Sequence, residues 1–103
     1  MWWLLLMRII AKRTLREFWQ KHNDAEVPLI GWYNKAKKSN WENFNDLKTQ
    51  IANVSVLGND RAVFNIKGND YRLVVAMDYE KQIIWIKFIG SHAEYDKINA
   101  KTV

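Results

Sequence analysis

RAVFNIKGNDYRLVVAMDYEKQIIWIKFIGSHAEYD, residues 61–96, is the stretch that decides the fold of this 103-residue chain. Three runs in it are rich in β-branched and aromatic residues: 63–67, 70–77 and 82–89. Two strands divided by the pair Gly68-Asn69 predict a tight β-hairpin. The third run follows the polar residues 78–81, which predicts a second turn and a third strand.

The register of the expected sheet follows from its turns. A two-residue first loop places Asn65 opposite Arg72, and a second turn of two or four residues places Val74 opposite Lys87. Side chains alternate between the faces of a strand, so one face is expected to be apolar: Phe64, Ile66, Leu73, Val75, Met77, Ile84, Ile86 and Phe88. Among Val63, Val74, Ala76 and Ile89, the other face carries the candidate RNA-binding residues: Arg61, Asn65, Lys67, Arg72, Trp85 and Lys87.

A helix start follows the third strand. The tetrapeptide SHAE at 91–94 is a capping box, with serine at the N-cap and glutamate three residues later. His92 lies in the first turn, and Tyr95 and Asp96 follow at spacings that share one helix face. The preceding strand brings this face close to Arg72. An arginine, an imidazole, a phenol and a carboxylate are therefore expected to converge at a helix start, where anions bind.

These four side chains suit phosphate and proton chemistry. His92 is of the type that titrates near neutrality, so it can act as a general acid or base. Arg72 can hold a phosphate in its planar fork. Tyr95 can donate a proton or stack on a base, and Asp96 can orient His92 or accept a proton. RNA needs no protein nucleophile, because its own 2′-hydroxyl can attack the adjacent phosphate.

Each of these residues also has a purely structural interpretation. His92 can simply occupy a helix first turn. Tyr95 and Asp96 can pack and cap, and Arg72 can form an ion pair with a neighbouring aspartate. Spacing alone therefore leaves both interpretations open.

The composition limits the functional classes. The length suits one compact domain, and 49% of the residues are hydrophobic. The net charge of +5 and the sequence pI of about 9.6 suit a polyanionic partner, either nucleic acid or an acidic protein. The absence of cysteine excludes disulfides, thiolate metal sites and a cysteine nucleophile, and it fits a reducing cytoplasm. Two histidines and no clustered carboxylates predict no metal and no other cofactor.

Two helices are expected before the sheet. Residues 11–22 and 24–38 each carry an apolar stripe, and together they predict an αα-hairpin that covers the apolar sheet face. The second helix ends in a basic group that either complements the helix dipole or contacts phosphate: Lys35, Lys37 and Lys38. The remaining elements are expected to be short: a helix within 41–50 capped by Asn43, strands at 7–10 and 54–57, and a C-terminal helix ending near Asn99.

Residues 1–6 (MWWLLL) form an apolar lead-in. They are too short to span a bilayer, and they lack the basic start and the cleavage site of a signal peptide. We expect an extension of the first strand, with membrane contact through Trp2 and Trp3 as the alternative. The chain is thus predicted to be a single α+β domain over 1–103, with two N-terminal helices on a mainly antiparallel sheet.

Two motifs carry a family resemblance. The pattern FN-x-x-GN-x-x-RLVV runs from Phe64 to Val75, and G-S/T-H-x-E-Y-D runs from Gly90 to Asp96. On these residues the chain resembles the HigB family of bacterial toxins within the RelE/ParE superfamily. The resemblance begins at Met7 and reaches the C-terminus, while residues 1–6 depart from the family pattern.

The resemblance implies a RelE-like fold and a type II toxin–antitoxin system. The implied activity is that of a metal-independent mRNA interferase, an endoribonuclease that cuts mRNA in the ribosomal A site. The implied partners are the ribosome and the helix-turn-helix antitoxin HigA, which alone would bring the toxin to operator DNA. Arg72 matches the family's strand arginine, and His92 with Tyr95 matches its C-terminal pair. Asp96 is added from helix geometry.

Two other functions remain open. A ParE-like toxin inhibits gyrase without cutting RNA, and the basic site with His92 disfavours it because ParE-type members lack such a cluster. A non-catalytic RNA- or ribosome-binding module would need the basic face but not His92. Mapping mRNA 5′ ends after induced expression separates the three functions.

Overall fold

A computed structural model describes residues 7–103, and the expected extension at 1–6 lies outside the described residues. This part of the chain forms a five-stranded sheet in the order β1-β5-β4-β3-β2. Its strands are β1 (Arg8–Ile10), β2 (Ser55–Leu57), β3 (Arg61–Ile66), β4 (Tyr71–Asp78) and β5 (Ile83–Ser91). Every pair is antiparallel except β1 with β5, so the mainly antiparallel α+β fold is confirmed.

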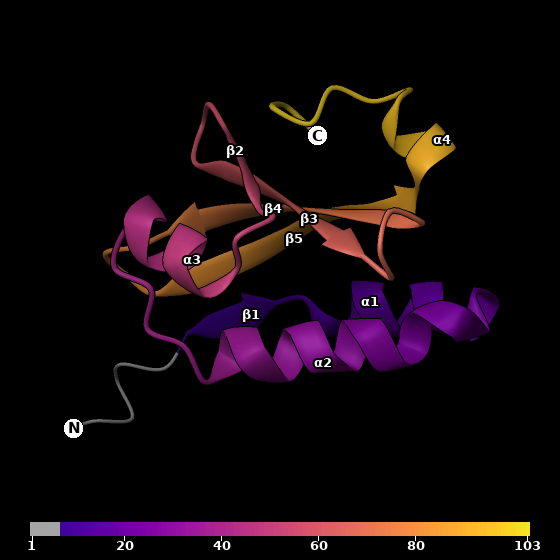
Figure 1. The fold of residues 1–103 in the computed structure, drawn as a ribbon, viewed down its shortest axis with the longest axis horizontal. Helices are drawn as coiled ribbons and strands as arrows, with labels where there is room; N and C mark the ends of the chain where they lie inside the picture. Colours follow the sequence, from indigo (N-terminus) through magenta and orange to yellow (C-terminus); the bar gives the residue numbers. More distant parts are fainter. Residues whose placement is uncertain (1–6) are drawn as a thin grey trace.

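Two helices cover one face of the sheet, as the apolar stripes predicted (Figure 1). They are α1 (Lys12–Lys21) and α2 (Glu26–Lys37), joined by the short 3-10 turn η2 (Asn23–Ala25). Their stripes are buried against the sheet through Leu15, Leu29, Trp32 and Ala36. The helix α3 (Phe44–Gln50) begins where expected, because the side chain of Asn43 accepts a hydrogen bond from the Asp46 N–H.

The β3–β4 hairpin has the predicted register. Asn65 lies opposite Arg72, and the Asp70 N–H donates to the Lys67 carbonyl over 3.2 Å across the loop. Gly68 takes a φ of 63°, which a glycine adopts without steric cost. The Gly-Asn signal therefore predicted this loop correctly.

The β4–β5 pair departs from the predicted register halfway along. From Asp78 to Val75 the pairing follows the expected four-residue turn, and beyond it a β-bulge shifts the register. Val74 lies opposite Phe88, so the prediction that it faces Lys87 was wrong. Lys87 is the extra residue of the bulge, and an extra residue exchanges the faces of the side chains that follow. Ile89 consequently packs into the main core, and Phe88, predicted to be a core residue, lies on the outer face.

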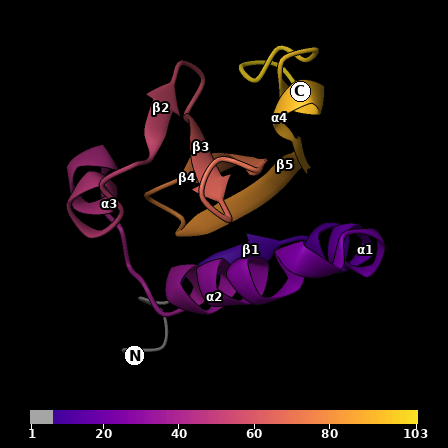
Figure 2. The ribbon, with the colours of Figure 1, turned by 45° about the vertical axis from the view of Figure 1, so that its right-hand side comes forward.

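Part of the outer face of the sheet, expected to be basic and aromatic, is covered by the residues that follow α4. A second apolar cluster forms there, built from Val63, Val74 and Ala100 with Leu57, Phe88, Tyr95 and Ile98 packed around them. The helix α4 (His92–Tyr95) ends well before Asn99, and the chain after it crosses this face (Figure 2). The capping box fixes the helix start, whereas burial of Ile98 and Ala100 on the sheet determines the path that follows.

Candidate active site and nucleic-acid interface

Arg72 and His92 lie at the same end of the sheet, which we call the hairpin end because it carries the β3–β4 loop (67–70) and α4. Arg72 on β4 lies opposite Gly90 on β5. The His92 N–H donates to the Asp70 carbonyl over 3.2 Å, which joins α4 to the loop beside Arg72. The sheet register and this hydrogen bond thus bring Arg72 and the backbone of His92 to the same end of the sheet.

The predicted capping box is present and holds the start of α4. The Ser91 hydroxyl accepts from the Glu94 N–H at 3.1 Å, and the Glu94 carboxylate accepts from the Ser91 N–H at 2.8 Å. The pKa of Glu94 is lowered by hydrogen bonds to its carboxylate, first from the Ser91 backbone and then from the Ser91 side chain. His92 is therefore attached to a firmly defined turn.

One edge of the Arg72 guanidinium is held by the protein. Its Nη1 donates to the Asn69 carbonyl at 3.0 Å and to the Tyr71 carbonyl at 3.4 Å. Within residues 7–103, Nε and Nη2 have no hydrogen-bond partner. The side chain is half-buried, so it presents a positioned pair of donors, the arrangement that binds a phosphate bidentately.

His92 and Asp96 lie together on the exposed side of α4. The distance from His92 Nε2 to Asp96 Oδ1 is 3.7 Å, and 56% and 64% of the two side chains are exposed. This distance is long for a hydrogen bond but suits an ion pair when the imidazole is protonated. The Tyr95 ring turns instead toward the sheet and packs on the outer apolar cluster.

One residue near this site, His22, could not be found from the sequence. Its ring centroid lies 5.7 Å from that of Tyr71, which pairs with Ser91 at the start of α4. His22 follows α1, where its ring stacks on Phe18 with centroids 4.3 Å apart. No local spacing could have found His22, because the fold brings it from the opposite end of the chain.

The other candidate RNA-binding residues do not form one surface. Lys67 is paired with Asp24 at 2.7 Å and with Asp70 at 3.3 Å. Arg61 donates to the backbone oxygen of Val103. Asn65 lies opposite Arg72, beside the site. Lys87 at the bulge and Lys37 on α2 have side chains exposed to solvent.

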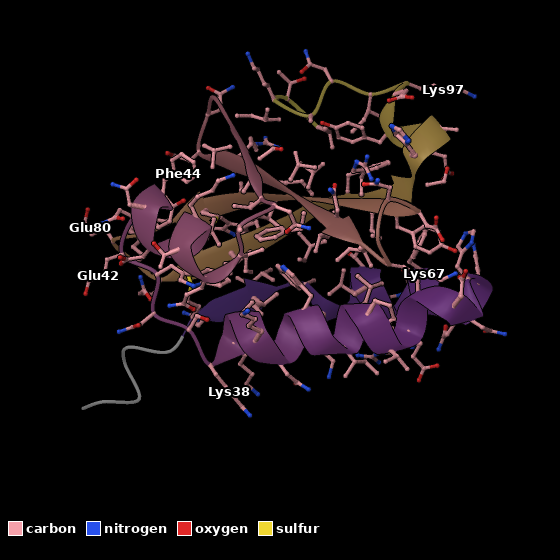
Figure 3. All side chains as sticks on the ribbon, viewed as in Figure 1. Lys38, Glu42, Phe44, Lys67, Glu80 and Lys97 are labelled. Carbon is pink, nitrogen blue, oxygen red and sulfur yellow. The ribbon has the colours of Figure 1, made fainter. Side chains whose placement is uncertain are left out.

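The basic end of α2 lies away from the hairpin end. Lys35 donates to the Gln50 carbonyl at 3.1 Å, so α3 is its neighbour. In Figure 3, Lys38 lies at the C-terminal end of α2, whereas Lys67, in the β3–β4 loop, lies above the opposite end of the helices. This group of lysines is separate from the Arg72 site.

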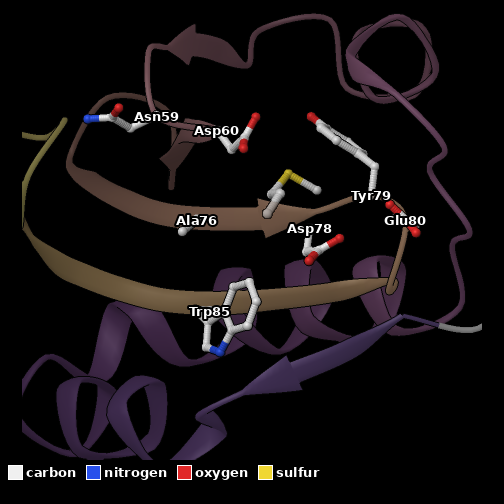
Figure 4. Close-up of a pocket in the computed structure, with 8 residues that line it drawn as sticks. Asn59, Asp60, Ala76, Asp78, Tyr79, Glu80 and Trp85 are labelled. Carbon is white, nitrogen blue, oxygen red and sulfur yellow. The ribbon is translucent and has the colours of Figure 1, made fainter.

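Trp85 lines a pocket of about 440 Å³ at the far end of the sheet (Figure 4). The pocket is lined by Asn59, Asp60, Ala76, Met77, Asp78, Tyr79, Glu80 and Trp85. Trp85 pairs with Ala76, which lies four residues along β4 from Arg72, or about 13 Å at the usual rise of an extended strand. The three carboxylates of this pocket would repel a phosphate, so Trp85 is unsuited to contact RNA together with Arg72.

Two further properties of residues 7–103 bear on function. No group of three or more histidine, aspartate or glutamate side chains there is arranged to hold a metal ion. No helix there is long and apolar enough to cross a bilayer.

Comparison with known proteins relates this chain to one family of bacterial toxins. Residues 25–98 match the family model HigB_toxin, described as the RelE-like toxic component of a toxin-antitoxin system. The mRNA interferase HigB of Escherichia coli O6:H1 (strain CFT073) is 26% identical over 94 residues, which cover 89% of this chain and 91% of that protein. The mRNA interferase toxin HigB of Escherichia coli (strain K12) and the mRNA interferase HigB of Shigella flexneri are each 27% identical over 97 residues, covering 91% of this chain and 92% of those proteins.

Proposed function

The chain belongs to the HigB family of RelE-like toxins, and from this premise we propose that it is a ribosome-dependent endoribonuclease that cuts mRNA in the A site without a metal. Membership makes it the toxic component of a toxin–antitoxin system, with an antitoxin as its partner. The resemblance carried by the two sequence motifs is thereby confirmed. Its curated relatives are named mRNA interferases, and the same reaction is proposed for this chain.

One observation carries the proposal: Arg72 and His92 are held by adjacent carbonyl groups of the same loop. Asn69 accepts from the guanidinium and Asp70 accepts from the His92 N–H. Cleavage through the 2′-hydroxyl needs a cation for the phosphate charge and groups that move protons, and Arg72 and His92 supply these two kinds of side chain at one end of the sheet.

The proposed reaction is an internal transfer on the RNA. The 2′-oxygen forms a bond to the adjacent phosphorus and the bond from phosphorus to the 5′-oxygen breaks. One proton leaves the 2′-hydroxyl and one is delivered to the departing 5′-oxygen. Arg72 stabilises the charge on the non-bridging oxygens through Nε and Nη2, while His92 transfers one of the protons and Asp96, 3.7 Å from its Nε2, orients the ring.

Tyr95 is the candidate for the second proton transfer. Its ring is held by the outer apolar cluster, and its hydroxyl makes no hydrogen bond to the described residues. We propose Asn65 and Lys87 as further RNA contacts on the outer face. Because their charges are already engaged within the protein, Lys67 and Arg61 are left out of the proposed contact set.

The proposed cellular setting follows from the substrate. A protein that acts on translating ribosomes works in the cytoplasm, and its proposed antitoxin is a HigA-type helix-turn-helix protein. The net charge of +5 favours association with ribosomal RNA. Operator DNA would be reached only through the antitoxin.

Analysis of the RNA ends tests this function. Purified ribosomes programmed with one mRNA should yield a fragment ending in a 2′,3′-cyclic phosphate and a fragment with a 5′-hydroxyl. His92→Ala should slow single-turnover cleavage by about 10²–10⁴-fold, and EDTA added at a level that leaves the ribosomes intact should have no effect. A 5′-phosphate product, or cleavage by His92→Ala within threefold of the wild-type rate, would overturn the mechanism. Ribosome binding without any cleavage would instead identify a binding module, and gyrase inhibition would identify a ParE-like toxin.

A further inference from the structure

Asp24, in the η2 turn between the two N-terminal helices, accepts hydrogen bonds from both ends of the β3–β4 loop. Its Oδ2 accepts from Lys67 Nζ at 2.7 Å, and its Oδ1 accepts from the Tyr71 hydroxyl at 2.5 Å. Lys67 is the first residue of the loop and Tyr71 follows its last. The Lys67 ammonium also lies 3.3 Å from Asp70 within the loop. We call Asp24, Lys67, Asp70 and Tyr71 the loop clamp.

The other side of the same loop holds the proposed catalytic groups. The Asn69 carbonyl accepts from Arg72 Nη1 at 3.0 Å, and the Asp70 carbonyl accepts from the His92 N–H at 3.2 Å. All four loop residues, 67–70, are exposed and therefore have little packing of their own. Figure 1 shows the loop between the helical layer and α4. Its position is thus set mainly by what holds its ends.

We infer that Asp24 is a positioning residue for RNA cleavage, because it fixes the loop whose carbonyls orient Arg72 and His92. The inference rests on the proposed function and adds to it a residue from the helical layer that touches neither proposed catalytic group. A displacement of about 1 Å at a reacting group can cost about 10²-fold in rate. Small movements of the loop are therefore sufficient for a measurable effect.

The chemistry of the clamp suits this role. The Asp24 pKa is lowered by hydrogen bonds from Lys67 and then from Tyr71, and the Tyr71 pKa is raised chiefly by its hydrogen bond to Asp24. At neutral pH the carboxylate therefore stays charged and the phenol keeps its donor proton. Exposed ion pairs add little to stability, and the side chains of Lys67 and Asp24 are 43% and 48% exposed. Their effect is therefore expected mainly on geometry, with only a small contribution to the free energy of unfolding.

Kinetics with a matched control variant form the first half of the test. Asp24→Ala and Tyr71→Phe remove the clamp in different ways, while Glu26→Gln neutralises an exposed carboxylate that makes no hydrogen bond within residues 7–103. With saturating programmed ribosomes, Asp24→Ala should cleave about tenfold more slowly while its Kd for ribosomes changes little. Tyr71→Phe should also cleave more slowly, and Glu26→Gln should cleave at the wild-type rate.

The second half of the test measures amide hydrogen exchange, which does not depend on RNA cleavage. In Asp24→Ala the His92 amide should exchange faster, because its acceptor Asp70 is released, whereas the amide of Leu73 in the buried part of β4 should keep its protection. An Asp24→Ala rate within twofold of the wild type, or unchanged exchange at His92, would overturn the inference. If the wild type cuts no RNA, the proposed function fails, and exchange at His92 alone then decides whether Asp24 positions it.

Discussion

Replacing Arg72 by alanine should abolish toxicity without unfolding the protein. Nε and Nη2 are the donors left free by the hairpin carbonyls, so the substitution removes two charge-assisted hydrogen bonds to the phosphate. We expect a loss of about 2–4 kcal/mol of transition-state stabilisation. At 1.36 kcal/mol per tenfold this is a rate reduced about 30- to 900-fold.

The cost to the fold should be much smaller. Arg72→Ala also removes the hydrogen bond to the Asn69 carbonyl, a loss of about 0.5–1.5 kcal/mol for one such bond. The protein should therefore remain folded, with a reduced unfolding midpoint. Arg72→Lys keeps the charge but lacks the planar fork, and we expect its rate to lie between those of the wild type and the alanine variant.

Single-turnover cleavage on programmed ribosomes measures this effect, with circular dichroism reporting the folded fraction. Arg13→Ala is the control, because Arg13 lies on α1 and its one ion pair among residues 7–103 is with the exposed Glu17. If folded Arg72→Ala cuts RNA within threefold of the wild-type rate, Arg72 stabilises no phosphate charge and the proposed site is wrong.

Three other outcomes are expected. Gly90→Ala should lower the unfolding midpoint through a loss of about 1–3 kcal/mol, because the new Cβ would lie 2.6 Å from the Phe88 ring; an unchanged thermal denaturation curve would contradict this. Asp24→Asn should be less stable than the wild type at pH 7, because the pKa of Asp24 in the folded protein lies below its usual 3.8. The difference in stability should shrink below pH 3.8 and vanish below the folded pKa. A difference in thermal unfolding that does not depend on pH would argue against the clamp. His92→Ala should bind the antitoxin within about tenfold, or about 1.4 kcal/mol, of the wild type by calorimetry, and a larger loss would place His92 in the partner interface.

The hairpin and the helix caps could be predicted because their causes are local. Gly68-Asn69 determines the loop between two adjacent strands, and Asn43 and Ser91 supply oxygens to the N–H groups three residues later. Each signal lies within a few residues of its effect. The existence and type of most elements followed from such signals.

The bulge at Lys87 and the path of the C-terminal residues could not be predicted in this way. Alternation of side chains carries no mark of one extra residue, and the faces of Phe88 and Ile89 were exchanged as a result. The capping box indicates where α4 begins but not where it ends. Its end depends on Ile98 and Ala100 finding an apolar surface on distant strands.

The candidate site was predicted only in part. Arg72 and His92 share one end of the sheet because β4 pairs with β5. The two sequence motifs lie on these strands, so the sequence indicated that the two residues belong together. Asp24 and Tyr71 form a contact between the helical layer and the sheet, which no periodicity within one element can reveal. Nothing in the sequence indicated that Lys67, on the predicted basic face, pairs with Asp24 and Asp70 within the protein.

The place of β1 has a consequence for the time course of folding. The strands β3, β4 and β5 pair with neighbours in sequence, whereas Arg8 on β1 pairs with Ile83 near the other end of the chain. Contacts between distant residues bear the larger cost of loop closure and form more slowly. During synthesis β1 is the first of these strands to emerge, yet it must wait for β5. The sheet is therefore completed only after β5 has been synthesised and has become free to pair with β1.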